Sequence, residues 1–180
     1  MKLAFKRTLA EMKEVLLDPE AMGPDPVYEV FTDLGDHFWV NKTILATGRY
    51  GKEYPKTFGH YHNHDVDEVY YVFEGEGVLL LQKRDASEVL LVRAKTGDRL
   101  VIQPEWGHSW SNIGDKPLVL LDNWSTPHSP TDYAKIEKMA GMAYYLIEED
   151  GEPTAVADKN YPKMPKPVWV TSADYQTRLG

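Results

Sequence analysis

The 180-residue sequence contains no cysteine, and no apolar run approaches the roughly 20 residues needed to cross a bilayer. Without cysteine, a disulfide framework, a thiolate metal site and a cysteine nucleophile are all excluded. The N-terminal stretch MKLAFKRTLAEMKEVLL is interrupted by charges every few residues, so it does not read as a signal peptide. We therefore expect a cytoplasmic protein that does not associate with a membrane.

The sequence also has fewer basic than acidic residues. The chain has 20 Lys and Arg against 28 Asp and Glu, giving a formal net charge of −8. Nucleic-acid-binding proteins usually carry a basic footprint, so we expect no nucleic-acid partner. A phosphorylated small molecule stays possible, because net charge governs solubility and steering and does not describe a single pocket.

Helical periodicity is scarce, whereas short extended runs recur from Val27 onwards between glycine, proline and aspartate turn signals. Helices are predicted only over Thr8–Leu17, which should pack outside the strands, and over Asp132–Met139. The extended runs cover Val27–Thr32, Phe38–Ala46, Val69–Phe73, Gly77–Gln82, Val89–Ala94, Arg99–Ile102, His108–Asn112 and Leu118–Trp124. Such closely spaced strands without intervening helices predict an antiparallel sandwich or barrel.

The length suits one domain over 1–180 with a substantial core. We divide it into an N-terminal helix and loop (1–26), a barrel core (27–125) and a C-terminal part (126–180). In the last part, Ala143–Glu148 and Thr154–Ala157 flank an Asp-Gly turn and predict a hairpin. The proline-rich tail from Pro162 is expected to be irregular.

The segment GHYHNHDVDEVY carries the first candidate chemistry. His60 and His62 are two residues apart, so in a strand both side chains point to one face. Glu68 begins the next apolar run, and His108 follows a proline turn much further along the chain. Three imidazoles and one carboxylate form a ligand set for a borderline divalent ion such as Fe, Mn, Ni, Co or Zn.

Other residues in the same stretch compete for this role. A His-x-His pair alone is a weak signal, and the joint pattern of both histidines, the glutamate and the distant histidine is what favours a metal site. Asp67 and His64 are the alternatives to Glu68 in the ligand set. His37 and His128 are interpreted as structural or rim residues.

These motifs resemble the cupin superfamily, whose two half-motifs correspond to Gly59–Gly77 and Pro104–His108. From about Val27 to Gly151 the chain resembles more specifically the cupin-type glucose-6-phosphate isomerases. The segments that match their pattern are Thr43, Gly51–Glu53, Thr57–His62, Glu68–Tyr70, Gly75–Gly77 and Trp106–Asn112.

The resemblance implies an all-β double-stranded β-helix, also called a cupin or jelly-roll barrel, that forms a homodimer and acts in glycolysis and gluconeogenesis. It implies one divalent metal ion per chain, iron first and Mn, Ni, Co or Zn as alternatives. The implied metal ligands are His60, His62, Glu68 and His108, the implied phosphate contacts are Thr43, Thr57, Gly59 and Tyr70, and the implied sugar contacts are Tyr28, Trp124 and Tyr133. Hydroxyls and a glycine N–H suit a phosphate without demanding basic side chains.

The chain departs from the family pattern at the sugar end. Thr47 stands where a proline is expected, Trp124 where a tyrosine is common, and His128 is displaced, with Thr131 in the nearer position. The metal and phosphate ends follow the pattern more closely.

The reaction this predicts is the interconversion of glucose 6-phosphate and fructose 6-phosphate. A divalent ion would polarise the sugar carbonyl, and Glu68 would move a proton between C1 and C2. A hydride shift is the mechanistic alternative. The rival functions are a cupin dioxygenase or decarboxylase, which would not need Thr43 and Thr57, and a non-catalytic sugar-binding cupin.

Overall fold

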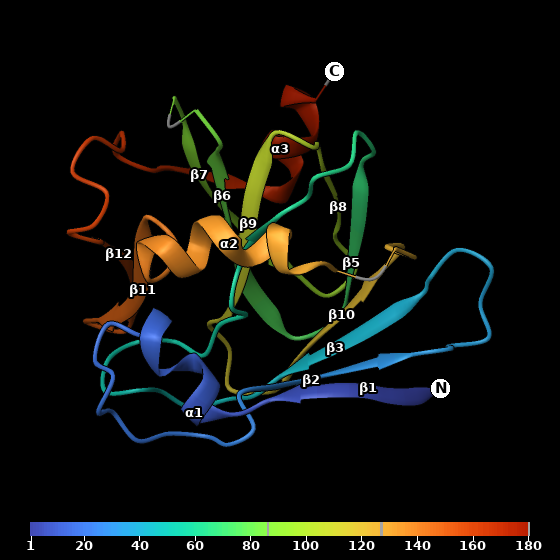
Figure 1. Ribbon diagram of the computed structural model, residues 1–180, viewed down its shortest axis with the longest axis horizontal. Coiled ribbons are helices and arrows are strands. Elements are labelled where there is room, and N and C mark those ends of the chain that lie inside the picture. The colour runs from blue at the N-terminus through green and yellow to red at the C-terminus, as the bar shows by residue number, and fades with distance from the viewer. Residues whose placement is uncertain (86, 127, 180) are drawn as a thin grey trace.

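Two sheets form facing walls of a barrel in the computed structural model, which describes residues 1–85, 87–126 and 128–179 (Figure 1). One sheet has the order β1 (Lys2–Arg7), β2 (Tyr28–Thr32), β3 (Asn41–Leu45), β10 (Leu118–Asp122), β5 (Glu68–Glu74) and β8 (Arg99–Ile102). The other has the order β13 (Val168–Thr171), β7 (Val89–Lys95), β6 (Glu76–Lys83), β9 (Trp106–Asn112) and β4 (His60–Tyr61). All of these strand pairs are antiparallel except β13 with β7. The predicted all-β barrel is confirmed.

The remaining elements lie around the barrel. A hairpin of β11 (Tyr144–Glu149) and β12 (Glu152–Ala157) confirms the hairpin predicted from the Asp-Gly turn. Helix α2 (Pro130–Met139) crosses the front of the barrel in Figure 1 and packs against β4. None of the helices in the described ranges is long and apolar enough to cross a membrane.

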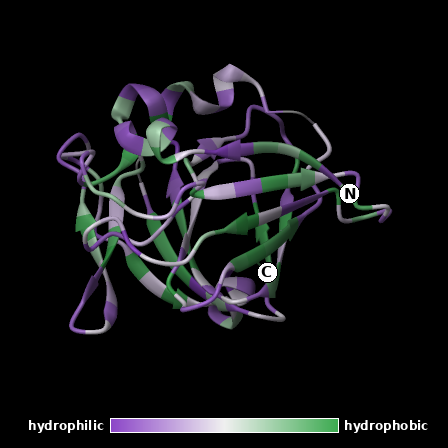
Figure 2. Ribbon diagram, turned by 90° about the horizontal axis from the view of Figure 1, so that it is seen from below, coloured by the Kyte–Doolittle hydropathy of each residue, from purple (hydrophilic) through white to green (hydrophobic). Residues whose placement is uncertain are grey.

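The core lies between the sheets, where alternate residues of each strand point inward. Leu79 and Leu81 on β6, Leu91 on β7 and Leu100 on β8 are completely buried, and Trp110 on β9 is 1% exposed. Figure 2 shows hydrophobic residues concentrated along the strands, with more hydrophilic residues on the loops. Burial of this apolar surface holds the barrel together, at roughly 25 cal/mol per Å² removed from water.

The N-terminal segment differs from its prediction. Helix α1 covers only Leu9–Met12 and continues as a 3-10 turn over Lys13–Val15, so the helix predicted to Leu17 is too long. It does start as predicted after Thr8, whose backbone N–H donates to the Glu11 carboxylate (2.7 Å) in a capping box. No strand is predicted before Thr8, whereas in the structure β1 pairs with β2 and extends the sheet.

The C-terminal tail is irregular over 162–167, as predicted from its prolines, but it is regular from Val168 onwards. The run VWVT forms β13, and Thr171 then caps helix α3 (Ser172–Arg178) by accepting a hydrogen bond from the Asp174 N–H (3.1 Å). Tyr175 is 1% exposed and donates its hydroxyl to the Val101 carbonyl (2.7 Å). The prolines therefore end before a β-branched and aromatic run that pairs with the barrel.

The Gly-x-Glu motif has a structural role, since Glu53 is completely buried and lies 2.6 Å from the Lys56 ammonium group. The other Glu53 oxygen accepts a hydrogen bond from the Leu17 N–H (2.7 Å), and the Lys56 ammonium lies 4.5 Å from the centre of the Tyr145 ring. This buried pair thus ties the N-terminal segment to the barrel.

We expect Glu53→Gln to lower the free energy of unfolding by about 3 kcal/mol, because the buried Lys56 charge loses its partner. Urea unfolding followed by tryptophan fluorescence measures the loss. Glu152→Gln is the matched control, since Glu152 pairs with Arg93 at 2.8 Å on the surface and its loss should be small. Equal losses in the two variants would contradict a structural role for the buried pair.

Candidate active site

Four side chains with nitrogen or oxygen donors converge inside the barrel. The pairing of β4 with β9 sets His60 opposite His108, and His62 follows β4 on the same side. Glu68 is the first residue of β5 in the facing sheet. One donor atom from each of the four residues lies within 4.8 Å of the others. The four predicted ligands are therefore brought together by strands from both walls of the barrel.

The spacing of these atoms fits a single divalent ion. The His60 and His62 Nε2 atoms are 2.8 Å apart, and Glu68 Oε2 lies 3.1 Å from His108 Nε2 and 3.6 Å from His62 Nε2. Two donors bound to one ion at about 2.1 Å and at right angles would be about 3.0 Å apart. Glu68 Oε2 and His108 Nε2 are also buried without a hydrogen-bond partner among the described residues, a costly arrangement that an ion would relieve.

Burial sets the protonation of this cluster. It lowers the pKa of His108 to about 4 and holds the pKa of His60 well below its usual value, so these imidazoles are neutral, as metal donors must be. Burial also raises the pKa of Glu68 to about 8. A dication beside this carboxylate would favour its ionised form and reverse that shift. The donor set thus matches a borderline divalent ion in both chemistry and geometry.

The alternative ligands lie elsewhere. His64 and Asp67 are exposed on the loop between β4 and β5, and neither belongs to the converging group. His37 is exposed as well. His128 instead lies in the cavity, with its ring centre 4.2 Å from that of His60 and 5.3 Å from that of His62.

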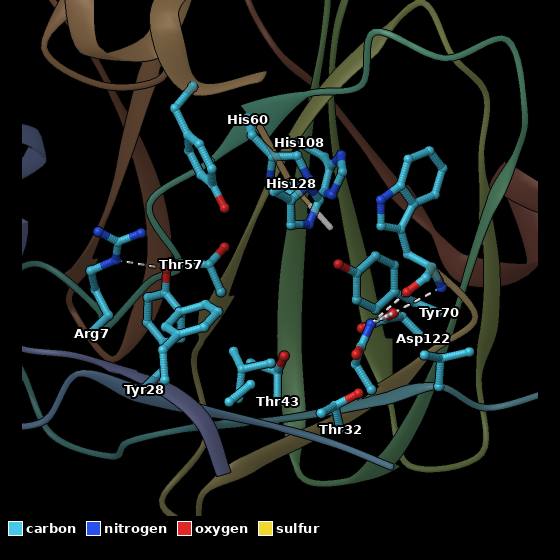
Figure 3. Close-up of a pocket in the computed structure, with 18 of the residues that line it drawn as sticks. Arg7, Tyr28, Thr32, Thr43, Thr57, His60, Tyr70, His108, Asp122 and His128 are labelled. Atoms are coloured by element: carbon cyan, nitrogen blue, oxygen red, sulfur yellow. Dashed lines mark hydrogen bonds between the residues drawn. The ribbon is translucent and has the colours of Figure 1, made fainter. Parts of the chain in front are cut away.

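A cavity of about 590 Å³ opens beside this cluster, between the two sheets (Figure 3). All of the residues predicted to contact the substrate line it: Tyr28, Thr43, Thr57, Gly59, Tyr70, Trp124 and Tyr133. His60 and His108 line it too, so the predicted metal end and the predicted substrate end share one space.

Sheet register explains why distant residues share this cavity. Directly opposed residues of an antiparallel pair lie on one face. Thr43 on β3 stands opposite Val30 on β2 and Leu120 on β10, and Asp122, two residues along β10, stands opposite Tyr70 on β5. Since side chains alternate along each strand, Thr43 and Tyr70 both lie on the inner face.

Thr57 and Gly59 approach from the opposite sheet. The Thr57 hydroxyl accepts a hydrogen bond from the Trp110 N–H (3.0 Å), so it anchors its own segment and can still donate into the cavity. Gly59 has φ +87°, and a Cβ there would lie 2.9 Å from the Met142 side chain. Only glycine suits this backbone, which leaves the main chain open to a ligand.

The predicted sugar end of the cavity contains stacked aromatic rings and one buried carboxylate. The Trp124 ring stacks on the His62 ring with their centres 3.7 Å apart. The centre of the Tyr133 ring lies 5.6 Å from that of the His60 ring. The Asp122 carboxylate accepts hydrogen bonds from the Asn41 side-chain amide (2.7 Å) and the Trp124 N–H (3.0 Å). Burial, reinforced by the charge of Glu68, raises the pKa of Asp122 to about 7.

Among the residues that line the cavity, sequence reasoning did not assign Arg7 or Asp122 to the site, and it interpreted His128 only as a structural or rim residue. Asp122 ends a strand that was predicted, so inward alternation from Leu118 and Leu120 could have found it. Arg7 lies on a strand that was not predicted. His128 follows no regular element, and only the fold brings it against His60.

Comparisons with known proteins show the family of the chain. The family model for glucose-6-phosphate isomerase matches residues 6–163. The glucose-6-phosphate isomerase of Thermococcus litoralis is 32% identical over 169 residues, covering 87% of this chain and 85% of that protein. The enzyme of Pyrococcus abyssi is 34% identical over 158 residues, covering 81% and 82%. Among solved structures, the capsular polysaccharide assembling protein CapF from Staphylococcus aureus is 20% identical over 58% of this chain and 28% of its own, with a TM-score of 0.44, too distant to carry an argument.

Proposed function

The chain belongs to the glucose-6-phosphate isomerase family, and from this membership we propose that it interconverts glucose 6-phosphate and fructose 6-phosphate with one divalent metal ion. His60, His62, Glu68 and His108 would hold the ion, with iron as the first candidate and Mn, Ni, Co or Zn as alternatives. The observation that carries the proposal is the convergence of these four donors, two of them unpartnered, beside a cavity.

Some residues of the site would hold the ion, and others would act on the sugar. When bound, the ion would polarise the sugar carbonyl and stabilise negative charge on its oxygen. Glu68 would carry the proton between C1 and C2, and Tyr70, two residues further along the same face of β5, would orient it. Trp124 stacked on His62 and Tyr133 beside His60 would exclude water from the reacting carbons.

The other end of the cavity would bind the phosphate. Thr43 and Thr57 offer hydroxyl donors, and Gly59 offers a backbone N–H that no Cβ obstructs. Such donors are well suited to phosphate oxygens. The cavity volume of about 590 Å³ lies within the usual range for small-molecule sites.

The proposed function is tested with purified protein that has been stripped of metal and then given one divalent ion at a time. Conversion of fructose 6-phosphate is followed together with oxygen uptake. Metal-dependent isomerisation without oxygen uptake is the expected result. Turnover that consumes oxygen would favour a dioxygenase, and binding without turnover a non-catalytic sugar-binding cupin.

Thr43→Val is expected to raise the KM for fructose 6-phosphate about tenfold and to leave the melting temperature and metal content close to those of the parent. The Thr43 hydroxyl has no hydrogen-bond partner among the described residues, so valine removes only a donor to the ligand. Thr57→Val should instead lower the melting temperature too, because it deprives the Trp110 N–H of its acceptor. An unchanged KM in Thr43→Val would contradict a phosphate contact.

Three expectations from the sequence stay predictions: the single domain over 1–180, the homodimer and the cytoplasmic location. Size-exclusion chromatography with light scattering tests the homodimer. A chain mass of 20.6 kDa predicts about twice that value in solution.

A further inference from the structure

The cavity contains few charged side chains apart from its histidines. Those among the described residues are Lys6 and Arg7 on β1, Glu11 on α1 and Asp122 on β10. Lys6 stands opposite Glu29 in the sheet and pairs with its carboxylate at 2.7 Å. Arg7 points to the other face of β1, because side chains alternate along a strand.

The Arg7 guanidinium is held in place without a carboxylate partner. Arg7 stands opposite Tyr28, and its Nε donates to the Tyr28 hydroxyl at 3.4 Å. Its central carbon lies 5.2 Å from the centre of the Phe58 ring and 5.9 Å from that of Tyr133, so aromatic faces support the planar group. No ion pair involves Arg7 within the part of the chain that is described.

The terminal nitrogens of Arg7 are therefore left to bind a ligand. They make no hydrogen bond to another described residue. The neighbouring Glu11 carboxylate makes no ion pair with Arg7, and its Oε2 atom accepts from the Thr8 N–H (2.7 Å) and the Thr8 hydroxyl (2.8 Å). A guanidinium whose Nε is anchored presents its other donors as a fork that matches two phosphate oxygens.

The two sides of the cavity therefore differ in their charged side chains. Figure 3 shows Arg7, Tyr28 and Thr57 gathered on one side, Thr43 between, and Tyr70 with Asp122 on the other side. Glu68 lies two residues before Tyr70 on β5 and therefore shares its face of the sheet. The Arg7 side offers a phosphate dianion a fork of N–H donors, whereas the Asp122 side offers carboxylate acceptors, so the phosphate fits the Arg7 side and the opposite end of a sugar phosphate would point towards Glu68.

We propose that Arg7 is the cationic ligand of the substrate's phosphate and thereby determines specificity for phosphorylated over neutral sugars. This inference rests on the proposed function. It also differs from the expectation that hydroxyls and a glycine N–H alone hold the phosphate. Neutral donors leave two negative charges uncompensated in this site, whereas Arg7, which packs on the ring of Phe58, the residue after Thr57, neutralises part of that charge. The first strand of the chain, absent from the sequence prediction, would then complete the site.

The test compares Arg7→Met with Lys6→Met, since both remove one positive charge from adjacent positions of β1 and Lys6 is paired with Glu29 on the opposite face of the strand. Arg7→Met should raise the KM for fructose 6-phosphate by about 10- to 100-fold, the usual loss for a charge-assisted hydrogen bond, with kcat changed by less than about threefold. The inhibition constant of inorganic phosphate should rise in parallel. Lys6→Met should keep both constants within about twofold, and Arg7→Lys should be intermediate because it keeps charge without the fork.

Equal KM values in Arg7→Met and Lys6→Met would overturn the inference, as would a loss of kcat with unchanged KM. Thermal melting checks that the variants are folded, and if Arg7→Met does not fold, Arg7→Lys decides by the same criteria. If the parent protein does not convert fructose 6-phosphate, the proposed function fails by itself. Calorimetric titration of inorganic phosphate into the parent and Arg7→Met proteins then still decides whether Arg7 binds phosphate.

Discussion

His62→Ala is expected to reduce isomerase turnover by at least about a thousandfold and to abolish stoichiometric metal binding. His62 Nε2 lies 2.8 Å from His60 Nε2 and 3.6 Å from Glu68 Oε2, so its removal opens one side of the donor cluster. Polarisation of a carbonyl by a metal ion contributes several kcal/mol, and each 1.36 kcal/mol corresponds to a factor of ten in rate. Loss of the ion should therefore remove most of the catalysis.

His64→Ala is the matched control, because His64 continues the same alternation of histidines but is exposed outside the cluster. It should keep the parent's turnover and metal content. Metal content is measured by mass spectrometry after dialysis, and far-ultraviolet circular dichroism checks the fold. Treating the parent with a chelator should likewise remove turnover and leave the barrel folded, since the apolar core holds it. Full activity in metal-free protein would overturn the metal proposal.

The strands could be predicted where apolar and polar side chains alternate, or where a continuous apolar stretch is bounded by turn residues. This worked for β6, β7 and β10, and the Asp-Gly turn correctly located the β11–β12 hairpin. It did not work for β1, whose Leu3 and Phe5 alternate with Lys2, Ala4 and Lys6 and stay about 40% exposed. Pairing with β2, rather than local sequence, makes that segment a strand.

The candidate ligands could be predicted from spacing, but their convergence could not. His60 and His62 share a face because they are two residues apart, whereas the approach of His108 depends on the register between β4 and β9. The same limit explains why Glu68, Asp67 and His64 could not be separated. A strand that begins at Glu68 buries it and leaves Asp67 exposed on the loop, and a shift by one residue would exchange their directions.

Residues whose roles depend on two elements were the hardest to predict. The Thr57 hydroxyl reads as a phosphate donor in the sequence, and the fold adds a second role as acceptor for the Trp110 N–H. Arg7 reads as one of several basic residues near the N-terminus, and only the pairing of β1 with β2 sets it beside Tyr28. The sequence therefore indicated the chemistry of the proposed metal end more completely than that of the proposed phosphate end.

Glu68→Gln is expected to lower turnover by about 10²- to 10⁴-fold, the usual contribution of a general acid or base, and to lower metal affinity by a smaller factor. Glutamine keeps the shape and one donor oxygen and removes the basicity. Three imidazoles remain to hold the ion, so turnover is measured with metal in excess. Asp67→Asn is the matched control, because it removes the adjacent carboxylate, which is exposed, and should retain the parent's rate.

Isomerisation in deuterated water then separates the two mechanisms. Proton transfer by Glu68 between C1 and C2 brings solvent deuterium into the product, although the burial of this carboxylate, which is 1% exposed, slows exchange and keeps part of the label out. A hydride shift brings in none at any extent of reaction. Deuterium in the parent's product, together with the loss of turnover in metal-saturated Glu68→Gln, would establish the carboxylate as the proton carrier. Absence of exchange, with a glutamine variant near the parent rate, would leave Glu68 as a metal ligand alone.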